Sequence, residues 1–480
     1  MLVWDRRRLV TGLAGSGAML GLPARGATRL NLNDASGLNP TPVARHVRPL
    51  SSARDAVVDT LRAELKAAAD AGRRVAVGAA RHSMGGQSLP RDGTAITFDS
   101  PWIEVDEKAG LYRVSAGMRW HEVIAKLDPL GFSPKVMQSN ADFGVASTFC
   151  VNAHGWPVPY GPFGSTVRGL RLMLADGGIV ECSREKEPDL FRLAMGGYGL
   201  FGVILDLDVE MVRNVQLAPT HARMKGEDFS AAFTKAVKEP GILMAYGRLN
   251  VERDSFFREA LLVTYRAVEP QPASLPPATH GGGMMGRVAS EIYRRETGSE
   301  WFKTLRWTME SVVNPRLSSG IATRNSLMNE PVANLANPFP QRTDILHEYF
   351  VPPDRFGDFL GVCREIIPPA KAEFLNVTLR YVAADPDAVM AFAPTPRIAA
   401  VMSFSQEKTV DGEIDMLTMT ERLIDGVLAC GGSFYLPYRL HARRDQVAAA
   451  YPASARFVAA KRKIDPKLLF RNAMWDAYFA

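Results

Sequence analysis

Helix-like and strand-like patterns of hydrophobic residues alternate along the first part of the chain. Between residues 53 and 71 the apolar positions recur at helical spacing, which predicts an amphipathic helix. Its apolar face consists of Ala56, Val57, Leu61, Leu65 and Ala68. Shorter apolar segments then predict strands at 74–77, 95–98 and 112–116 and a helix over 120–130. This order of elements predicts an α+β half that binds a nucleotide.

Strand-like patterns return in two further sets. The first set lies at 168–175, 179–182 and 203–211. The second set lies at 343–351, 374–382 and 398–404. Helical segments separate the strands of the second set, which predicts an antiparallel sheet covered by helices. Between the sets, prolines precede three glycines within 270–287, a composition typical of a mobile surface loop.

Length and charge restrict the class of protein. A chain of 480 residues with 46% hydrophobic and 22% charged residues is globular in composition and too long for one core, so we expect two domains. Three units of the formal net charge of +6 come from the first 26 residues, where four arginines face one aspartate. The remaining +3 is too small a bias to indicate nucleic-acid binding.

The first 26 residues have the pattern of a targeting segment. Arg6 and Arg7 precede a mildly apolar, glycine-containing stretch over 10–22, and Ala24 and Gly26 then form a small-x-small cleavage site. The arginine pair resembles a twin-arginine signal, which predicts export to the periplasm. A Sec signal or a short membrane anchor is the alternative, although the apolar stretch is too short for a stable membrane span.

The cysteines and histidines do not indicate a metal site. Cys150, Cys182, Cys363 and Cys430 form no CxxC pair, and no cluster has metal-ligand spacing. We therefore expect buried thiols and no metal.

The loop at 78–87 carries the first chemical signal. Glycines and other small residues after a strand allow backbone N–H groups to approach a pyrophosphate. The loop lacks the GxGxxG spacing of a Rossmann site and the Gly-Lys-Ser/Thr of a P-loop. Another kind of nucleotide site is indicated.

Three ordered segments carry a family resemblance: the loop at 77–83, the segment at 144–155, and residues 189–191 leading into 196–204. Together they resemble the FAD domain of the vanillyl-alcohol oxidase / p-cresol methylhydroxylase (PCMH) family over about residues 45–212. The tail at 463–472 is similar as well. The motifs are most similar to those of alditol oxidases and aldonolactone oxidases.

This resemblance implies an α+β, two-domain PCMH-type FAD-binding fold with an antiparallel-sheet substrate (cap) domain. The expected boundaries are a signal peptide at 1–26, an FAD-binding domain at 40–215 and a cap domain at 216–430 that contains the loop near 270–290. We expect residues 431–480 to return to the FAD domain.

The resemblance also implies the residues that hold FAD. They are Gly78, Ala79, Ala80, Arg81, His82, Ser83, Met84, Ser139, Gly144, Ser147, Val151, Asn152, Ala153, His154 and Ile204. In the relatives, the histidine matching His82 is bonded to the flavin 8α-methyl group, and a neutral imidazole nitrogen is a competent nucleophile for that bond. The alternative is that His82 only hydrogen-bonds the phosphate or the ring. His154 is either a flavin contact or a structural loop residue.

On the substrate side the sequence departs from its relatives. The strand around Arg380 resembles one that carries a glutamate and an arginine two residues apart, and here Thr378 replaces the glutamate. Two-residue spacing puts both side chains on one sheet face. Arg380 is expected to orient the substrate oxygen, unless it is a surface strand arginine. Tyr438 and His441 replace a histidine and a lysine of the sugar-lactone oxidases and are candidates for proton transfer.

Other polar residues are weaker candidates. Glu348 and Tyr349 lie on one predicted strand and are expected either at the pocket or on a solvated face. Arg324, Asn325 and Glu330 lie in a polar stretch that is a candidate cover for the substrate.

The expected reaction is hydride transfer from a CH–OH group of a small alcohol, such as a sugar, polyol or lactone, to flavin N5. Gln138 precedes Ser139 at a position where small residues favour reaction with O₂ in the relatives, so we expect a dye, quinone or cytochrome as acceptor in preference to O₂. The alternatives are a flavin-dependent C=C reductase and an exported flavin-binding protein without turnover.

Overall fold

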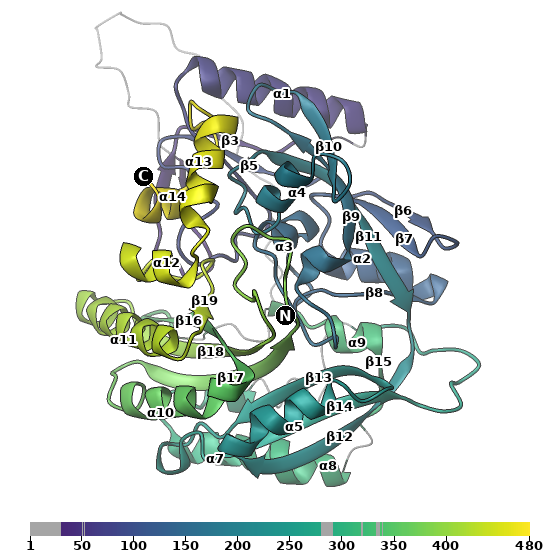
Figure 1. Cartoon of the computed structure of the whole chain (residues 1–480), viewed down its shortest axis with the longest axis vertical. Helices are drawn as coiled ribbons and strands as arrows, with labels where there is room; N and C mark the ends of the chain where they lie inside the picture. Colours follow the sequence, from purple (N-terminus) through teal and green to yellow (C-terminus); the bar gives the residue numbers. More distant parts are fainter. Residues whose placement is uncertain are drawn as a thin grey trace, which may run out of the picture.

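The computed structural model describes residues 30–49, 51, 53–279, 291–317, 320–332, 337 and 339–480. The predicted signal peptide at 1–26 and most of the predicted loop at 270–290 lie outside these residues. Figure 1 shows two stacked parts, an upper one with helix α1 and a lower one with the largest sheet, and the C-terminal helices lie beside the upper part. The α+β fold with a large antiparallel sheet is confirmed.

A small parallel sheet begins the upper part. Its strand order is β3 (Arg45–Val47), β5 (Thr94–Thr97) and β4 (Val75–Gly78), and helix α1 (Arg54–Asp70) connects β3 to β4. Val57, Leu61, Leu65 and Ala68 form the buried face of α1 as predicted. Ala56 is exposed, contrary to the prediction, because it lies about 100° around the helix from Val57.

A second, six-stranded sheet completes the upper part. Its strands are β10 (Ile179–Ser183), β9 (Val167–Met173), β11 (Val203–Arg213), β7 (Leu111–Ser115) and β6 (Ile103–Asp106), with β8 (Phe132–Pro134) also paired to β11. The accompanying helices are α2 (Trp120–Leu127), α3 (Val145–Cys150) and α4 (Pro188–Ala194). A 3₁₀ turn follows α2 and ends at Gly131, whose φ of 74° is the left-handed conformation that glycine adopts readily.

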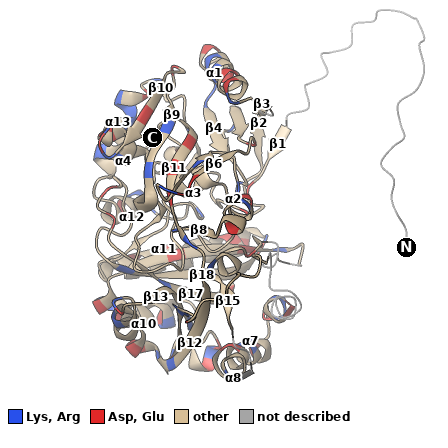
Figure 2. Cartoon of the chain, turned by 90° about the vertical axis from the view of Figure 1, so that its right-hand side faces the viewer, with Lys and Arg blue, Asp and Glu red and all other residues tan. Residues whose placement is uncertain are grey.

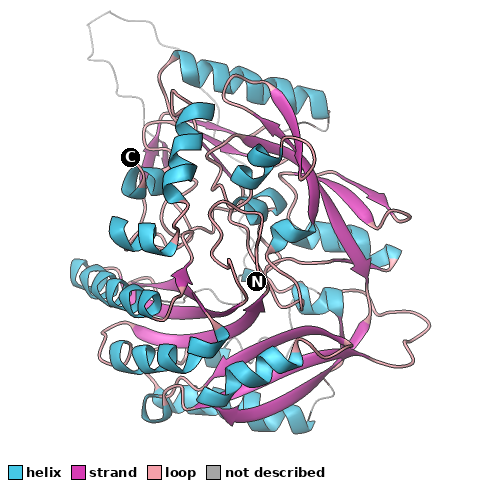
Figure 3. Ribbon diagram, in the orientation of Figure 1, coloured by secondary structure: helices cyan, strands magenta, loops and turns pink. Residues whose placement is uncertain are grey.

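The lower part is an eight-stranded antiparallel sheet. Its order is β15 (Ala322–Thr323), β12 (Gln216–Lys225), β14 (Glu259–Ala267), β13 (Ile242–Leu249), β17 (Glu373–Val382), β18 (Arg397–Glu407), β16 (Arg342–Val351) and β19 (Ser433–Phe434). The helices that accompany it are α5 (Phe229–Ala236), α7 (Glu300–Thr308), α8 (Asn314–Leu317), α9 (Arg324–Met328), α10 (Phe356–Ile366) and α11 (Val410–Ala429). Figure 3 shows α10 and α11 lying along this sheet.

Alternation along the central strands separates a core face from a polar face. On β17, Val377 and Leu379 are fully buried in the hydrophobic core, whereas Thr378 and Arg380 project to the opposite face. The polar face therefore lies between the sheet and the upper part.

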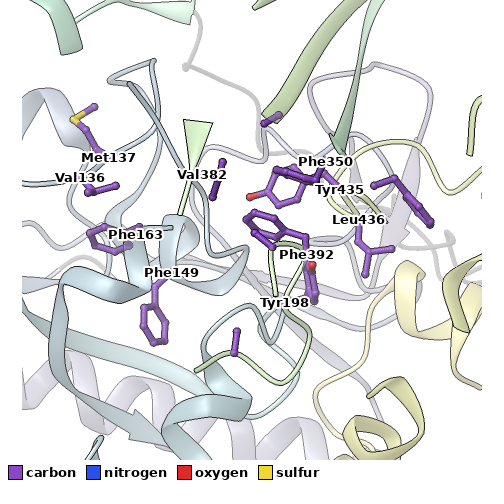
Figure 4. Close-up of a cluster of buried hydrophobic side chains, with 14 of the residues drawn as sticks. Val136, Met137, Phe149, Phe163, Tyr198, Phe350, Val382, Phe392, Tyr435 and Leu436 are labelled. Atoms are coloured by element: carbon purple, nitrogen blue, oxygen red, sulfur yellow. The ribbon is translucent and has the colours of Figure 1, made fainter. Parts of the chain in front are cut away.

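The C-terminal segment connects the two parts. After β19, the chain passes through helices α12 (Arg444–Ala450), α13 (Ser454–Ile464) and α14 (Ala473–Tyr478). The tail pairs with strand β4, since Val75 N–H donates to the Leu469 carbonyl (2.6 Å) and Arg471 N–H donates to the Val75 carbonyl (3.1 Å). Figure 4 shows Tyr435 and Leu436 in a hydrophobic cluster with Tyr198 of the upper part and Phe350 of the sheet.

The surface carries mixed charge, and the four cysteines are unpaired thiols. Figure 2 shows Lys and Arg residues interspersed with Asp and Glu residues along both parts. Among the described residues, no helix is long and apolar enough to cross a membrane, and no group of three or more metal-ligating side chains is present. The remaining short strands, β1 (Leu30–Leu32) and β2 (Thr41–Val43), pair at the N-terminal end of this region.

Candidate functional site

A cavity of about 1180 Å³ lies between the two parts and is lined by residues from all three larger sheets. Sites for a single small molecule usually measure about 300–1,000 Å³, so this cavity is larger than a usual site of that kind. Of the predicted FAD contacts, it brings together Gly78, Ala79, Ala80, Arg81, His82, Ser83, Met84, Ser139, Gly144, Ser147, Val151, Ala153, His154 and Ile204.

The loop after β4 presents free backbone donors. Within the described part of the chain, the N–H groups of residues 79–83 make no hydrogen bond. The loop is nevertheless fixed at both sides, because Ala35 N–H donates to the Arg81 carbonyl (3.0 Å) and Met84 N–H donates to the Pro437 carbonyl (2.9 Å). Arg81 adopts a φ of 54°. A run of unpaired donors in a fixed concave loop is suited to a pyrophosphate.

His82 projects from this loop into the cavity. Its ring packs on Phe143, with 4.6 Å between the ring centroids. Burial lowers the pKa of His82; Asp142 acts in the opposite direction, and Arg119 adds to the lowering. The imidazole is therefore neutral at physiological pH, which is the nucleophilic form.

The second segment predicted to hold FAD begins at Gly144, the residue before α3. A Cβ at this position would come within 2.8 Å of the Ala79 Cβ. The two loops can approach this closely only because residue 144 is glycine. Ser139 and Ser147 line the same wall of the cavity.

Two predicted site residues lie elsewhere, which corrects the sequence analysis. Asn152 is buried behind the wall, where its side chain accepts a hydrogen bond from Gly164 N–H (2.8 Å) and donates to Asp385 (2.8 Å). His441 is buried outside the cavity, with Nε2 2.8 Å from Glu413 and Nδ1 3.3 Å from Thr420. Both side chains are engaged in holding the chain together.

The substrate-side candidates meet on the polar face of the large sheet. Arg380, Thr378 and Tyr438 all line the cavity, and so does Glu348. Arg380 Nη1 donates to the His154 carbonyl (3.2 Å), and the Tyr438 hydroxyl donates to Glu348 (3.3 Å). Burial lowers the pKa of Arg380, whereas the neighbouring Glu348 raises it.

Register explains how Glu348 comes to this face. Glu348 on β16 pairs with Val401 on β18, and Val401 pairs with Thr378 on β17. The three residues form one row across the sheet. Thr378 stands where the strand that it resembles carries a glutamate, and the same sheet face carries a carboxylate, Glu348, two strands away. Tyr349, the next residue, points to the core and lies outside the cavity.

Of the three polar residues that were candidates for a cover over the substrate, one reaches the cavity. Glu330 lines the cavity. Arg324 and Asn325 are buried outside it, where Arg324 donates to the Lys135 carbonyl (2.6 Å) and Asn325 to Asp128 (2.7 Å). These two residues join the parts of the molecule and do not cover the cavity.

Sequence reasoning missed a group of residues deeper along the sheet. Arg248 on β13 donates to the Thr378 hydroxyl and to Asn376 (3.2 Å), and Arg306 on α7 donates to Glu310 (2.8 Å) and Asn376 (2.9 Å). All of these residues line the cavity. The one sequence signal that could have pointed to this group was the two-residue spacing of Asn376, Thr378 and Arg380, which puts these three side chains on one strand face.

Unpaired buried polar atoms test whether the cavity fits FAD and a polar substrate. The cavity-lining residues with such an atom include Arg81 (Nε), Gln138 (Nε2), Ser139 (Oγ), His154 (Nδ1), Trp156 (Nε1) and Arg380 (Nε). Buried donors and acceptors normally have partners. Their presence beside the free N–H groups of the 79–83 loop fits a ligand with phosphate and heteroaromatic groups.

Comparison with known proteins identifies the cofactor. Residues 56–183, which include α1, the 78–84 loop and α3, match the family model of an FAD binding domain. This match confirms the predicted PCMH-type FAD domain.

Three relatives illustrate the range of similarity. The chain is 28% identical over 172 residues to D-arabinono-1,4-lactone oxidase of Yarrowia lipolytica, which covers 33% of this chain and 31% of that protein. It is 32% identical over 136 residues to L-galactono-1,4-lactone dehydrogenase 2 of Oryza sativa subsp. japonica, covering 28% and 23%. An uncharacterized oxidoreductase of the fasciation locus of Rhodococcoides fascians is 24% identical over 328 residues, covering 63% and 74%. The alignments thus span less than a third of the lactone enzymes.

Proposed function

We propose that this chain, with its PCMH-type FAD-binding domain, is an FAD-dependent oxidoreductase that oxidises the CH–OH group of a sugar, polyol or lactone. One observation carries the proposal. The cavity joins the flavin-facing loops to a sheet face on which Arg380, Tyr438 and Glu348 converge. The likeness of part of the chain to D-arabinono- and L-galactono-lactone enzymes supports this chemistry.

The chain's own residues have distinct roles in this reaction. When bound, FAD accepts the hydride at its N5 atom. Arg380 holds a buried positive charge beside the cavity, which stabilises negative charge on the substrate oxygen as its proton leaves. Arg248 fixes the Thr378 hydroxyl and Asn376, so these groups are oriented to bind further hydroxyls of the substrate.

We further propose that His82 is bonded covalently to FAD. An imidazole nitrogen would replace one hydrogen of the 8α-methyl group. The hydrogens lost from the imidazole and from the methyl group would leave as two protons, and the two electrons would pass through the flavin to the electron acceptor. The neutral state that burial favours supports this role. Acid precipitation should leave the yellow colour on the wild-type protein and release it from His82→Ala, whereas release from both would exclude the bond.

The electron acceptor depends on access to the flavin. Gln138 lines the cavity and its Oε1 accepts a hydrogen bond from the Thr148 hydroxyl (2.7 Å), which holds the amide in place. A fixed, bulky amide supports slow reaction with O₂ and a quinone, dye or cytochrome as acceptor. An exported, periplasmic enzyme, as the first 26 residues predict, would use such acceptors.

The decisive experiment is anaerobic mixing of the purified flavoprotein with polyols, aldoses, lactones and hydroxy acids while flavin absorbance is followed. Loss of the oxidised flavin band with at least one alcohol, and slower loss in Arg380→Met at equal flavin content, is the expected result. Failure of every alcohol to reduce the flavin would reject the oxidation of CH–OH groups. Oxidation of the pre-reduced flavin by an activated C=C compound would then favour a reductase.

A further inference from the structure

A histidine and a carboxylate form a buried pair at the cavity wall. His154 and Glu348 each have a relative exposure of only 4%, and His154 Nε2 lies 2.5 Å from Glu348 Oε1. The other carboxylate oxygen accepts the hydrogen bond from the Tyr438 hydroxyl. His154 comes from the segment that follows α3, and Glu348 comes from β16. The pair therefore forms only when the two parts of the molecule are assembled.

The contact with Glu348 determines which ring nitrogen of His154 carries the proton. An ionised carboxylate only accepts hydrogen bonds, so Nε2 of the neutral ring must be the donor. The other nitrogen, Nδ1, then has a free lone pair. It is buried and has no hydrogen-bond partner among the described residues. His154 thus combines an oriented tautomer with an unused acceptor in a residue that lines the cavity.

Burial favours the neutral form of this ring, and the surrounding charges act in both directions. Burial lowers the pKa of His154, Glu348 raises it, and Arg380 lowers it again. The ring also packs edge-on against Phe350, with 5.5 Å between centroids. A proton taken up at Nδ1 would be stabilised by the adjacent carboxylate. This is the arrangement by which a buried carboxylate supports a histidine base.

Other groups on the substrate side are less suited to accept a proton. Arg380 is a cation with no acceptor. The Tyr438 hydroxyl already donates to Glu348, and burial beside that carboxylate raises the Tyr438 pKa well above its ordinary value. The Thr378 hydroxyl accepts from Arg248. Glu310 is bound by Arg306.

We propose that His154 is the general base of the reaction and that Glu348 is the positioning residue that fixes its tautomer, an inference that rests on the proposed alcohol oxidation. The substrate O–H bond breaks and its proton moves to His154 Nδ1. The C–H hydrogen leaves with both electrons to the flavin, and the carbon–oxygen double bond forms.

The tautomer can be measured without turnover. In full-length protein labelled with ¹⁵N-histidine, the resonances of His154 are assigned as those missing from His154→Asn. In the wild type we expect a protonated Nε2 and an unprotonated Nδ1 near neutral pH. In Glu348→Gln we expect a different ratio of the two His154 tautomers, because an amide can donate a hydrogen bond to Nε2 as well as accept one. A protonated Nδ1 in the wild type would overturn the proposal.

Anaerobic stopped-flow reduction gives the catalytic test. The wild-type rate of flavin reduction should rise with pH to a plateau as His154 loses its proton. We call this rising part of the pH profile the limb. His154→Ala should lose this limb and react about 10²–10⁴-fold more slowly, and added imidazole should restore part of the rate. In Glu348→Gln the limb should move to lower pH, because the carboxylate that raises the His154 pKa is gone.

A matched control is available outside the cavity. Glu413→Gln alters a second glutamate–histidine pair, at His441, and should leave the midpoint of the pH limb unmoved. If His154→Ala retains full flavin, the wild-type rate and the wild-type limb, the role of the His154–Glu348 pair as base and positioning residue is refuted, while alcohol oxidation stands. If no alcohol reduces the wild-type flavin, the proposed function is refuted, and the proposed role of the His154–Glu348 pair is refuted with it.

Discussion

Replacement of Gly144 by alanine should weaken FAD binding, because the two flavin-facing loops touch at this residue. An added Cβ would lie 2.8 Å from the Ala79 Cβ. The backbone at Gly144 has φ −77° and ψ 144°, a conformation that alanine adopts without strain. The perturbation is therefore purely steric and acts between the 78–84 loop and the start of α3.

The size of the effect follows from the overlap. Carbon atoms are normally about 3.5–4.0 Å apart, so the loops must separate by about 1 Å. Overpacking of this kind costs about 1–3 kcal/mol. If the separation opens the FAD cradle, that cost corresponds to a Kd about 5–150-fold higher, at about 1.4 kcal/mol for each factor of ten.

Reversible binding must be measured without the proposed covalent bond. We would therefore compare His82→Ala with His82→Ala/Gly144→Ala by titrating the apoprotein with FAD and following flavin fluorescence. Adding Ala79→Gly to the double variant removes the atom that the new Cβ meets, and should restore most of the affinity.

Gly357→Ala in α10 is the matched control, since a Cβ there meets nothing within 4 Å. It should leave the Kd for FAD unchanged. Equal Kd values, within twofold, for His82→Ala with and without Gly144→Ala would refute the reasoning.

Four further outcomes are expected. Arg380→Met should retain FAD but reduce the rate of flavin reduction about 10²–10³-fold, measured by stopped flow, because a buried cation beside the substrate oxygen is lost. Gln138→Ala should speed reoxidation of the reduced flavin by O₂, and an unchanged oxygen rate would count against the amide as a barrier. Asp465→Asn should cost about 3–5 kcal/mol in denaturant unfolding, because it leaves the fully buried Lys461 ammonium without its partner. Burial lowers the pKa of His347 to about 3, so its contribution to stability is present above about pH 6.5 and is lost as pH falls towards 3, at about 1.4 kcal/mol per unit. His347→Phe should flatten the dependence of unfolding free energy on pH in this range.

Local patterns were sufficient to predict the longer elements of the upper part, namely α1, α2, β4, β5, β7, β9, β10 and β11, whereas the short elements β3, β6, β8, α3 and α4 were missed. The helical spacing of Val57, Leu61, Leu65 and Ala68 is a property of one continuous segment, and so is the small-residue loop after β4. The error at Ala56 arose because alanine is equally compatible with a buried and an exposed helix face. Composition at that position carries little information.

The site on the large sheet could be predicted only in part, since it depends on contacts between distant strands. Arg380 and Thr378 were found because their spacing lies within one strand. Arg248 and Glu348 reach the same face from β13 and β16, and their positions depend on strand order and register. His441 was misplaced because the direction of a side chain in a loop has no period from which to read it.

The position of Glu348 changes what can be expected of the substrate. Neighbouring strands lie about 4.8 Å apart, so a carboxylate on β16 stands about 10 Å across the sheet from Thr378 on β17. Arg380 remains on β17, and its Nη1 reaches the carbonyl of His154, whose ring contacts Glu348. The cation and the histidine–carboxylate pair therefore still converge, but the pair approaches from the β16 side. We expect the reacting carbon to lie near His154, with the remaining hydroxyls directed towards Arg248 and Thr378. A substrate bound in that direction need not share the shape of a lactone, so polyols and aldoses belong in the first panel beside the lactones.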